Sequence, residues 1–140
     1  MTRILGVGSP FGADRLAWRA IDHLAELDLK DCELTKLDRP GGQLISYFQG
    51  VDRVVVIDAV CLPDNPGSVT NIDLEILHQM EYLTSSHGFG VAEAVALARQ
   101  LGQLPSHFHI LGIQTGKDTT QLPAIDLPML TGLVRGLITA

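Results

Sequence analysis

The 140-residue sequence has few cysteines and no long apolar run. Its two cysteines, Cys32 and Cys61, do not have the spacing of a structural zinc site, and we expect two free, half-buried thiols. No apolar segment approaches the ~18 residues that a membrane helix requires. The chain opens with an apolar strand-like segment, Arg3–Val7, and not with the pattern of a signal peptide. These features predict a cytoplasmic protein with no membrane contact.

Positive charge is also scarce, with 10 Lys and Arg residues against 16 Asp and Glu residues. The formal net charge of −6 and the pI of about 5.2 argue against a general nucleic-acid or anionic-membrane binder, because both need a positive surface. A protein partner remains compatible with this charge. Hydrophobic residues make up 46% of the chain, which is typical of a compact globular protein. Without a repeat or a linker, we expect one domain over residues 1–140.

Strand-like and helix-like segments alternate along the chain. Short apolar segments predict strands at Arg3–Val7, Glu33–Leu37, Arg53–Ala59, Val69–Ile72 and Phe108–Ile113. Helical spacing predicts helices at Leu16–Ala25, Gln43–Gln49, Gly90–Leu101 and Leu127–Ile138, the first of them capped by Asp14. The run Val54–Ile57 is typical of a central parallel strand buried on both faces. The sequence therefore predicts an α/β three-layer sandwich, with a twisted, mostly parallel sheet of about five strands between helices.

Two acids stand where predicted parallel strands end. Asp38 follows the second strand and Asp58 follows the valine-rich strand, and ligands of such sheets bind at the carboxyl ends of the strands. His87, in the small-residue loop before the Gly90–Leu101 helix, could join them. Acids and an imidazole form a plausible cation site. The alternatives are an Asp58 that caps the following loop and a His87 that is solvated or caps a helix.

Two other motifs give weaker signals. The turn Gly6–Gly12 superficially resembles a dinucleotide-binding turn, but its spacing is G-x-G-x-x-x-G and Pro10 interrupts it, which favours a plain strand-to-helix turn. Ser85 and Ser86 stand beside His87, yet no G-x-S-x-G motif is present, which disfavours a serine triad.

In order along the chain, several fragments resemble the nickel–iron hydrogenase maturation proteases, which are C-terminal endopeptidases. The matching pieces are Ile4–Pro10 with Asp14, Leu37–Asp38 with Gly41–Gly42, Val55–Ala59, Pro66–Val69, Ser86–Val91 and Ile110–Gln114. No single piece is decisive, whereas the ordered set is fairly specific and spans nearly the whole chain.

The resemblance implies an endopeptidase that removes a C-terminal extension from a hydrogenase large-subunit precursor once nickel is loaded. It implies that Asp58 and His87 contact the nickel, which the substrate supplies; a third contact of the family is not matched, and we expect Asp14 to serve in its place. For catalysis it points to Asp58 and His87, with Asp38 assisting. The resting protein is not expected to need nickel of its own.

One position departs from the family pattern. An acid usually follows the residue that matches Asp14, and this chain has Arg15, whose guanidinium cannot bind a cation. The alternative function is therefore a catalytically impaired homologue that acts as a binding or chaperone-like protein. A nucleotide-binding enzyme that uses the Gly6–Gly12 turn is a third hypothesis. The sequence leaves open which hydrogenase is the substrate, where it is cut and the oligomeric state.

Overall fold

A computed structural model describes residues 1–61, 65–73, 75, 77, 90–117 and 121–139. The five strands are β1 (Thr2–Gly8), β2 (Cys32–Asp38), β3 (Arg53–Val60), β4 (Val69–Ile72) and β5 (His107–Gln114). The helices are α1 (Leu16–Ala25), α3 (Val91–Gln100) and α4 (Leu127–Thr139), with 3-10 helices η1 (Gly12–Arg15) and η2 (Gly41–Phe48). Each predicted strand and helix is present, and its bounds differ from the prediction by at most two residues.

The five strands form one sheet in the order β2-β1-β3-β5-β4. β1 pairs in parallel with β2 and β3, β3 pairs in parallel with β5, and only the edge pair β4 and β5 is antiparallel. The predicted α/β fold with a mostly parallel sheet is therefore confirmed. Since β1, β2 and β3 run in the same direction, their carboxyl ends lie at one edge of the sheet.

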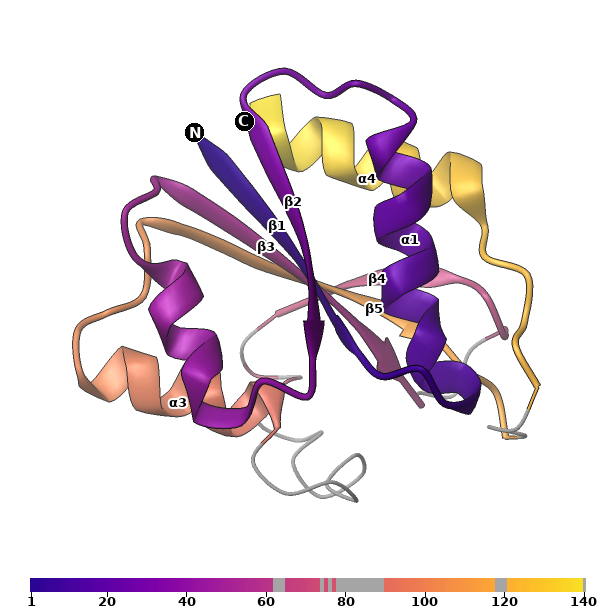
Figure 1. Ribbon diagram of the computed structural model, residues 1–140, viewed down its shortest axis with the longest axis horizontal. Helices are drawn as coiled ribbons and strands as arrows, with labels where there is room; N and C mark the ends of the chain where they lie inside the picture. Colours follow the sequence, from indigo (N-terminus) through magenta and orange to yellow (C-terminus); the bar gives the residue numbers. More distant parts are fainter. Residues whose placement is uncertain (62–64, 74, 76, 78–89, 118–120, 140) are drawn as a thin grey trace.

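Helices cover both faces of the twisted sheet: α1 and α4 lie on one side, and η2 and α3 on the other (Figure 1). Successive residues of β3 serve the two faces. Val54 and Val56 belong to the core cluster under η2 and α3, whereas Val55 and Ile57 belong to the cluster under α1 and α4. All four side chains have 0% exposure, as the continuous β-branched run predicted.

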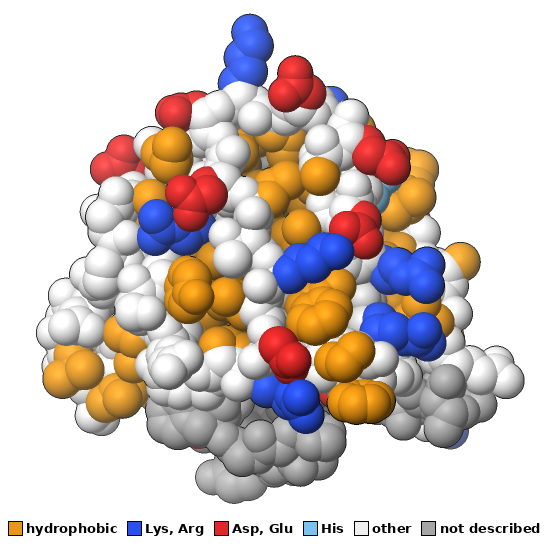
Figure 2. Space-filling model, in the orientation of Figure 1, with side chains coloured by type: hydrophobic (Ala, Val, Ile, Leu, Met, Phe, Trp, Pro, Cys, Tyr) orange, Lys and Arg blue, Asp and Glu red, His pale blue; other side chains and the backbone are white. Residues whose placement is uncertain are grey.

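On the face drawn in Figure 2, acidic and basic side chains are interspersed and do not gather into one patch. Within the described residues, no helix combines the length and the apolar character needed to cross a bilayer.

One local prediction is wrong. Asp14 does not cap α1, because it lies inside η1 and the residue at the N-cap of α1 is Arg15, which makes no side-chain cap hydrogen bond. The 3-10 helix η1 (Gly12–Arg15) runs directly into α1, so Asp14 lies one residue before the N-cap of α1.

Candidate active site

A pocket of about 310 Å³ opens at the carboxyl edge of the sheet. Its walls come from the ends of β1 and β3, from η1, from the start of η2 and from the start of α3. The described residues that line it are Val7, Gly8, Asp14, Arg39, Pro40, Gly41, Leu44, Asp58, Ala59, Gly90 and Val91. The turn after β1, the segment that follows Asp38 and the end of β3 thus meet in one concave site.

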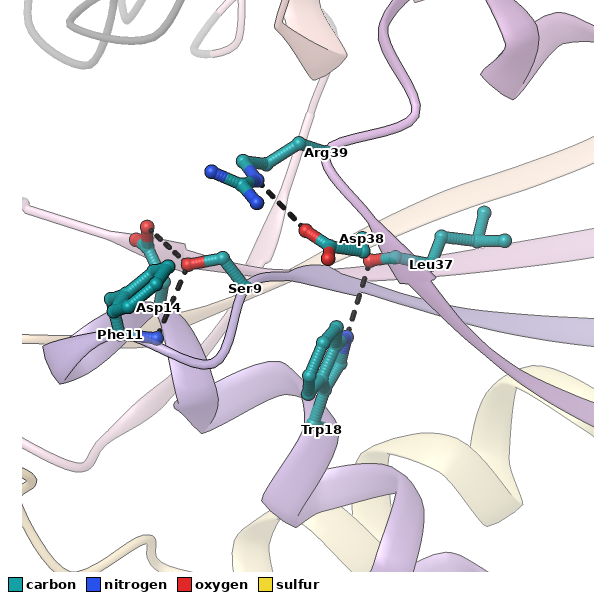
Figure 3. A network of polar contacts seen from close by, with 7 residues as sticks. All are labelled: Ser9, Phe11, Asp14, Trp18, Leu37, Asp38 and Arg39. Carbon is teal, nitrogen blue, oxygen red and sulfur yellow. Dashed lines mark hydrogen bonds and ion pairs between the residues drawn. The ribbon is translucent and has the colours of Figure 1, made fainter.

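The turn after β1 is closed by its own side chains and backbone. Ser9, with 1% exposure, donates its hydroxyl to the Oδ2 of Asp14 over 3.0 Å, as Figure 3 shows. The Ser9 N–H donates to the carbonyl of Asp14 over 3.2 Å. A Cβ on Gly8 would collide with that same carbonyl, so only glycine permits this close approach. The turn therefore holds the carboxyl group of Asp14 at the pocket.

Asp58 lines the same pocket from β3 and is half-buried. The pKa of its carboxyl group is raised to about 7: burial raises it most, a hydrogen bond from the Ala59 N–H lowers it, and the negative charge of Asp14 adds a smaller increase. The electrostatic coupling means that Asp14 and Asp58 share one local environment. Such a pair binds a cation or shares a proton more favourably than it holds two free charges.

Asp38 takes a different position from the one that its strand-end location suggested. It is exposed, and its Oδ1 accepts a 2.8 Å ion-pair hydrogen bond from the Nε of the neighbouring Arg39. Arg39, and not Asp38, lines the pocket together with Asp14 and Asp58. A catalytic role for Asp38 stays a prediction.

Arg39 received no role in the sequence analysis. Its backbone N–H donates to the carbonyl of Gly8 over 3.0 Å, which joins the end of β2 to the end of β1. Its guanidinium carbon lies 5.8 Å from the centre of the Phe11 ring, within the range of a cation–π contact. The only sign of this role in the sequence was a basic residue directly after Asp38, the acid that ends β2.

Arg15 lies outside this lining, although it follows Asp14 directly. Its Nε donates to the carbonyl of Gly12 over 3.0 Å, within its own turn. Among the described residues, which include both pocket acids, Arg15 forms no ion pair with Asp14 or Asp58. The guanidinium therefore does not neutralise either carboxyl group by direct contact.

His87, the third member of the predicted site, lies outside the described residues. Within the part of the chain that the structure describes, no group of three or more His, Cys, Asp or Glu side chains could hold a metal ion. Cys61 is exposed, as a free thiol, and its Sγ is 3.7 Å from the carbonyl oxygen of Gly116. What the described residues supply is two coupled carboxyl groups, one guanidinium and an apolar wall.

Comparisons with known proteins bear on the family and on the fold. A family model described as "HycI: Hydrogenase maturation protease" matches residues 39–125, which are more than half of the chain. The curated "Hydrogenase expression/formation protein HupD" of Thiocapsa roseopersicina is 28% identical over 116 residues, which cover 79% of this chain and 52% of that protein. The chain therefore spans about half the length of this curated relative.

Two solved structures illustrate the likeness of fold. The hydrogenase maturating endopeptidase HybD from E. coli has a TM-score of 0.70 and 18% identity, over 99% of this chain and 87% of that chain. The nickel–iron hydrogenase maturation protease HycI from Thermococcus kodakarensis KOD1 has a TM-score of 0.62 and 18% identity, over 99% and 92% of the two chains. At these identities the structural similarity speaks for a shared fold.

Proposed function

Because this chain belongs to the hydrogenase maturation protease family, we propose that it removes the C-terminal extension from a nickel-loaded hydrogenase large-subunit precursor. The observation that carries the proposal is the pairing of Asp14 with Asp58 in one pocket at the carboxyl edge of the sheet. Family membership gives the class of reaction, and the pocket gives a place where a cation on the substrate could be bound. We expect the reaction to take place in the cytoplasm.

In this proposal the nickel belongs to the substrate. The carboxyl oxygens of Asp58 and Asp14 and the imidazole of His87 would contact it, and those contacts would position the scissile peptide bond. The nickel ion would polarise the carbonyl group or an attacking water. The raised pKa of Asp58 supports this role, since a cation would favour the ionised form that burial disfavours.

The test is processing of the nickel-loaded precursor by purified variants. Asp58→Asn and His87→Ala are each expected to lower processing at least about 100-fold, because each removes a contact to the substrate's nickel. Matched controls are Asp52→Asn, in a carboxyl group that is 90% exposed, and His107→Ala, in an exposed histidine at the start of β5. Both controls should process normally. If Asp58→Asn and His87→Ala retain wild-type cleavage with an intact fold, these roles are refuted.

A second candidate is a binding protein on the same fold that does not cleave the precursor. Arg15 favours it, since a cation stands at a position where the family pattern has an acid. The discriminating variant is Arg15→Glu, studied by calorimetry with nickel or cadmium. A gain in metal affinity over a non-binding wild type would show that the arginine disables a cation site. Metal binding by the wild type would remove the main support for this candidate.

A further inference from the structure

Arg39 is the only Lys or Arg among the described residues that line the pocket. Its Nε is occupied by Asp38, but neither terminal nitrogen of its guanidinium has a hydrogen-bond or ion-pair partner among the described residues. In Figure 3 the guanidinium extends from Asp38 toward the side of the pocket on which Phe11 and Asp14 lie. A forked pair of N–H donors is thus presented at the rim of an acid-lined site.

The contribution of this arginine to stability does not account for its presence. Arg39 has a φ of 44°, in the left-handed region, where a non-glycine residue costs of the order of 1 kcal/mol that glycine avoids. Its ion pair with Asp38 joins side chains that are 58% and 50% exposed, and such pairs stabilise proteins by about 0–1 kcal/mol. Strained backbone conformations cluster at functional positions.

The surroundings of Arg39 also fix the direction of its side chain. The backbone is tied to Gly8, Nε is tied to Asp38, and the guanidinium lies over the ring of Phe11. A guanidinium held in one orientation loses less side-chain entropy when it binds, and its flat fork matches a carboxylate. Asp38 therefore acts here as a positioning residue.

We propose that Arg39 binds a carboxylate of the peptide segment that the pocket processes, and so determines substrate affinity. The inference rests on the proposed function, and it deepens that function by assigning the substrate an acidic group close to the cation-binding carboxyl groups. That group is either an Asp or Glu side chain of the segment or the terminal carboxylate of the extension.

The first experiment measures processing of the nickel-loaded precursor by Arg39→Gln and by the control Arg135→Gln, which removes an exposed arginine on α4. Loss of a charge-assisted, two-pronged contact should raise KM at least about 10-fold and change kcat less than about 2-fold. Arg39→Lys should restore part of the affinity, because it keeps the charge without the fork. Arg135→Gln should match the wild type. An unchanged KM in Arg39→Gln overturns the proposal.

A second measurement does not depend on cleavage. The Nε–Hε resonance of Arg39, assigned by its loss in Arg39→Gln, is followed by NMR during titration with a synthetic peptide of the precursor's C-terminal extension. Three forms are used: all carboxylates free, side-chain carboxylates amidated, and the terminal carboxylate amidated. The resonance should move with the free form, and the amidated form that fails to move it identifies the source of the carboxylate. Equal behaviour with all three forms overturns the proposal.

These outcomes are separable from failure of the proposed function. If the wild type cleaves no precursor while the Arg39 resonance still responds to carboxylates, the endopeptidase proposal fails and the carboxylate site stands. Arg39→Gly adds a check on folding, because it removes the side chain and relieves the backbone strain. Its melting temperature should equal or exceed that of the wild type, while its KM for the precursor should rise as in Arg39→Gln. A clear fall in melting temperature would mean that Arg39 is structural, which overturns the argument.

Discussion

Two arginines at opposite edges of the sheet each pair through Nε with an acid of β2. They differ in the partners of their terminal nitrogens and in their exposure. At the amino edge, Arg3 donates through Nε to Glu33 over 2.9 Å, and its Nη1 donates to the carbonyls of Tyr47 and Gln49 over 3.0 and 2.9 Å. At the carboxyl edge, Arg39 donates through Nε to Asp38, and the described residues give its terminal nitrogens no partner. The Arg3 side chain is 18% exposed and that of Arg39 is 58% exposed.

The difference separates a structural edge from an edge suited to binding. Arg3 holds the end of η2 and the loop before β3 to the first strand, and its Nε and Nη1 both donate to groups of the protein. The carboxyl edge instead has a half-buried carboxyl group with a raised pKa, an arginine at a positive φ and an exposed ring. These features reduce stability unless something binds, so variants at the two edges should respond in opposite ways.

The largest stability effect is expected at the pocket edge, from Asp58→Asn. The pKa of Asp58 in the folded protein, about 7, lies above the ordinary value of 3.8. The folded state therefore binds this proton more tightly than the unfolded state, so the residue favours folding below about pH 4 and this contribution is lost as the pH rises through 7. The asparagine variant should be more stable than the wild type by about 2–4 kcal/mol at pH 8, and close to it at pH 4.

Denaturant unfolding between pH 4 and pH 8 measures this effect, with Asp52→Asn as the fully hydrated counterpart. That control should leave the pH profile unchanged, because a carboxyl group that is 90% exposed is not desolvated on folding. A wild type and an Asp58→Asn variant with parallel profiles over this range would show that the carboxyl group of Asp58 is not held in a desolvated site.

The sequence was sufficient to predict the frame of the molecule. The β-branched run of β3 predicted a buried central strand, and the helical spacing of α1 predicted a helix that covers the sheet. Both predictions succeed because buried positions recur with the period of the element, whichever apolar residue occupies them. The family resemblance noticed from ordered fragments is likewise confirmed by the family model. β1 and β3 run parallel, as predicted, and this direction brings Asp14, which follows β1, and Asp58 of β3 to one pocket.

What the sequence could not predict depends on single side chains and on short irregular turns. Asp14 lies inside the 3-10 turn η1 and not at the N-cap of α1, and periodicity does not register a four-residue helix. Arg39 lines the pocket and Asp38 does not, and no pattern of polarity encodes either this choice or the φ of 44° at Arg39. The direction of the Arg15 side chain was equally open until its bond to Gly12 was visible.

At the amino edge the comparison predicts a moderate loss of stability. Arg3→Met keeps much of the aliphatic stem but leaves the carbonyls of Tyr47 and Gln49 without their donor, and the first of these is partly buried. The free energy of unfolding should fall by about 2 kcal/mol. The control Glu33→Gln keeps an acceptor for Nε and removes only an exposed charge, so its effect should stay below about 0.5 kcal/mol.

Precursor processing by folded Arg3→Met should keep the KM of the wild type, which is the opposite of the behaviour expected for Arg39→Gln. Chemical denaturation and processing kinetics on the same preparations check both halves of this statement. A rise in KM for Arg3→Met would show that the amino edge also affects substrate binding, which contradicts the distinction between the two edges.

The smallest effect is expected from Phe11→Ala, which tests whether the pocket edge positions its arginine. Phe11 is 66% exposed, so little apolar surface is lost from water on folding and stability should change by less than about 0.5 kcal/mol. An exposed cation–π contact contributes about 0.5–1 kcal/mol, so a less ordered Arg39 should raise KM about 2- to 5-fold without a change in kcat. Leu101→Ala removes a comparably exposed apolar side chain, at the end of α3, and should leave KM unchanged. Equal KM values for the two alanine variants would mean that the ring does not orient the guanidinium, and that Asp38 and the backbone alone hold it.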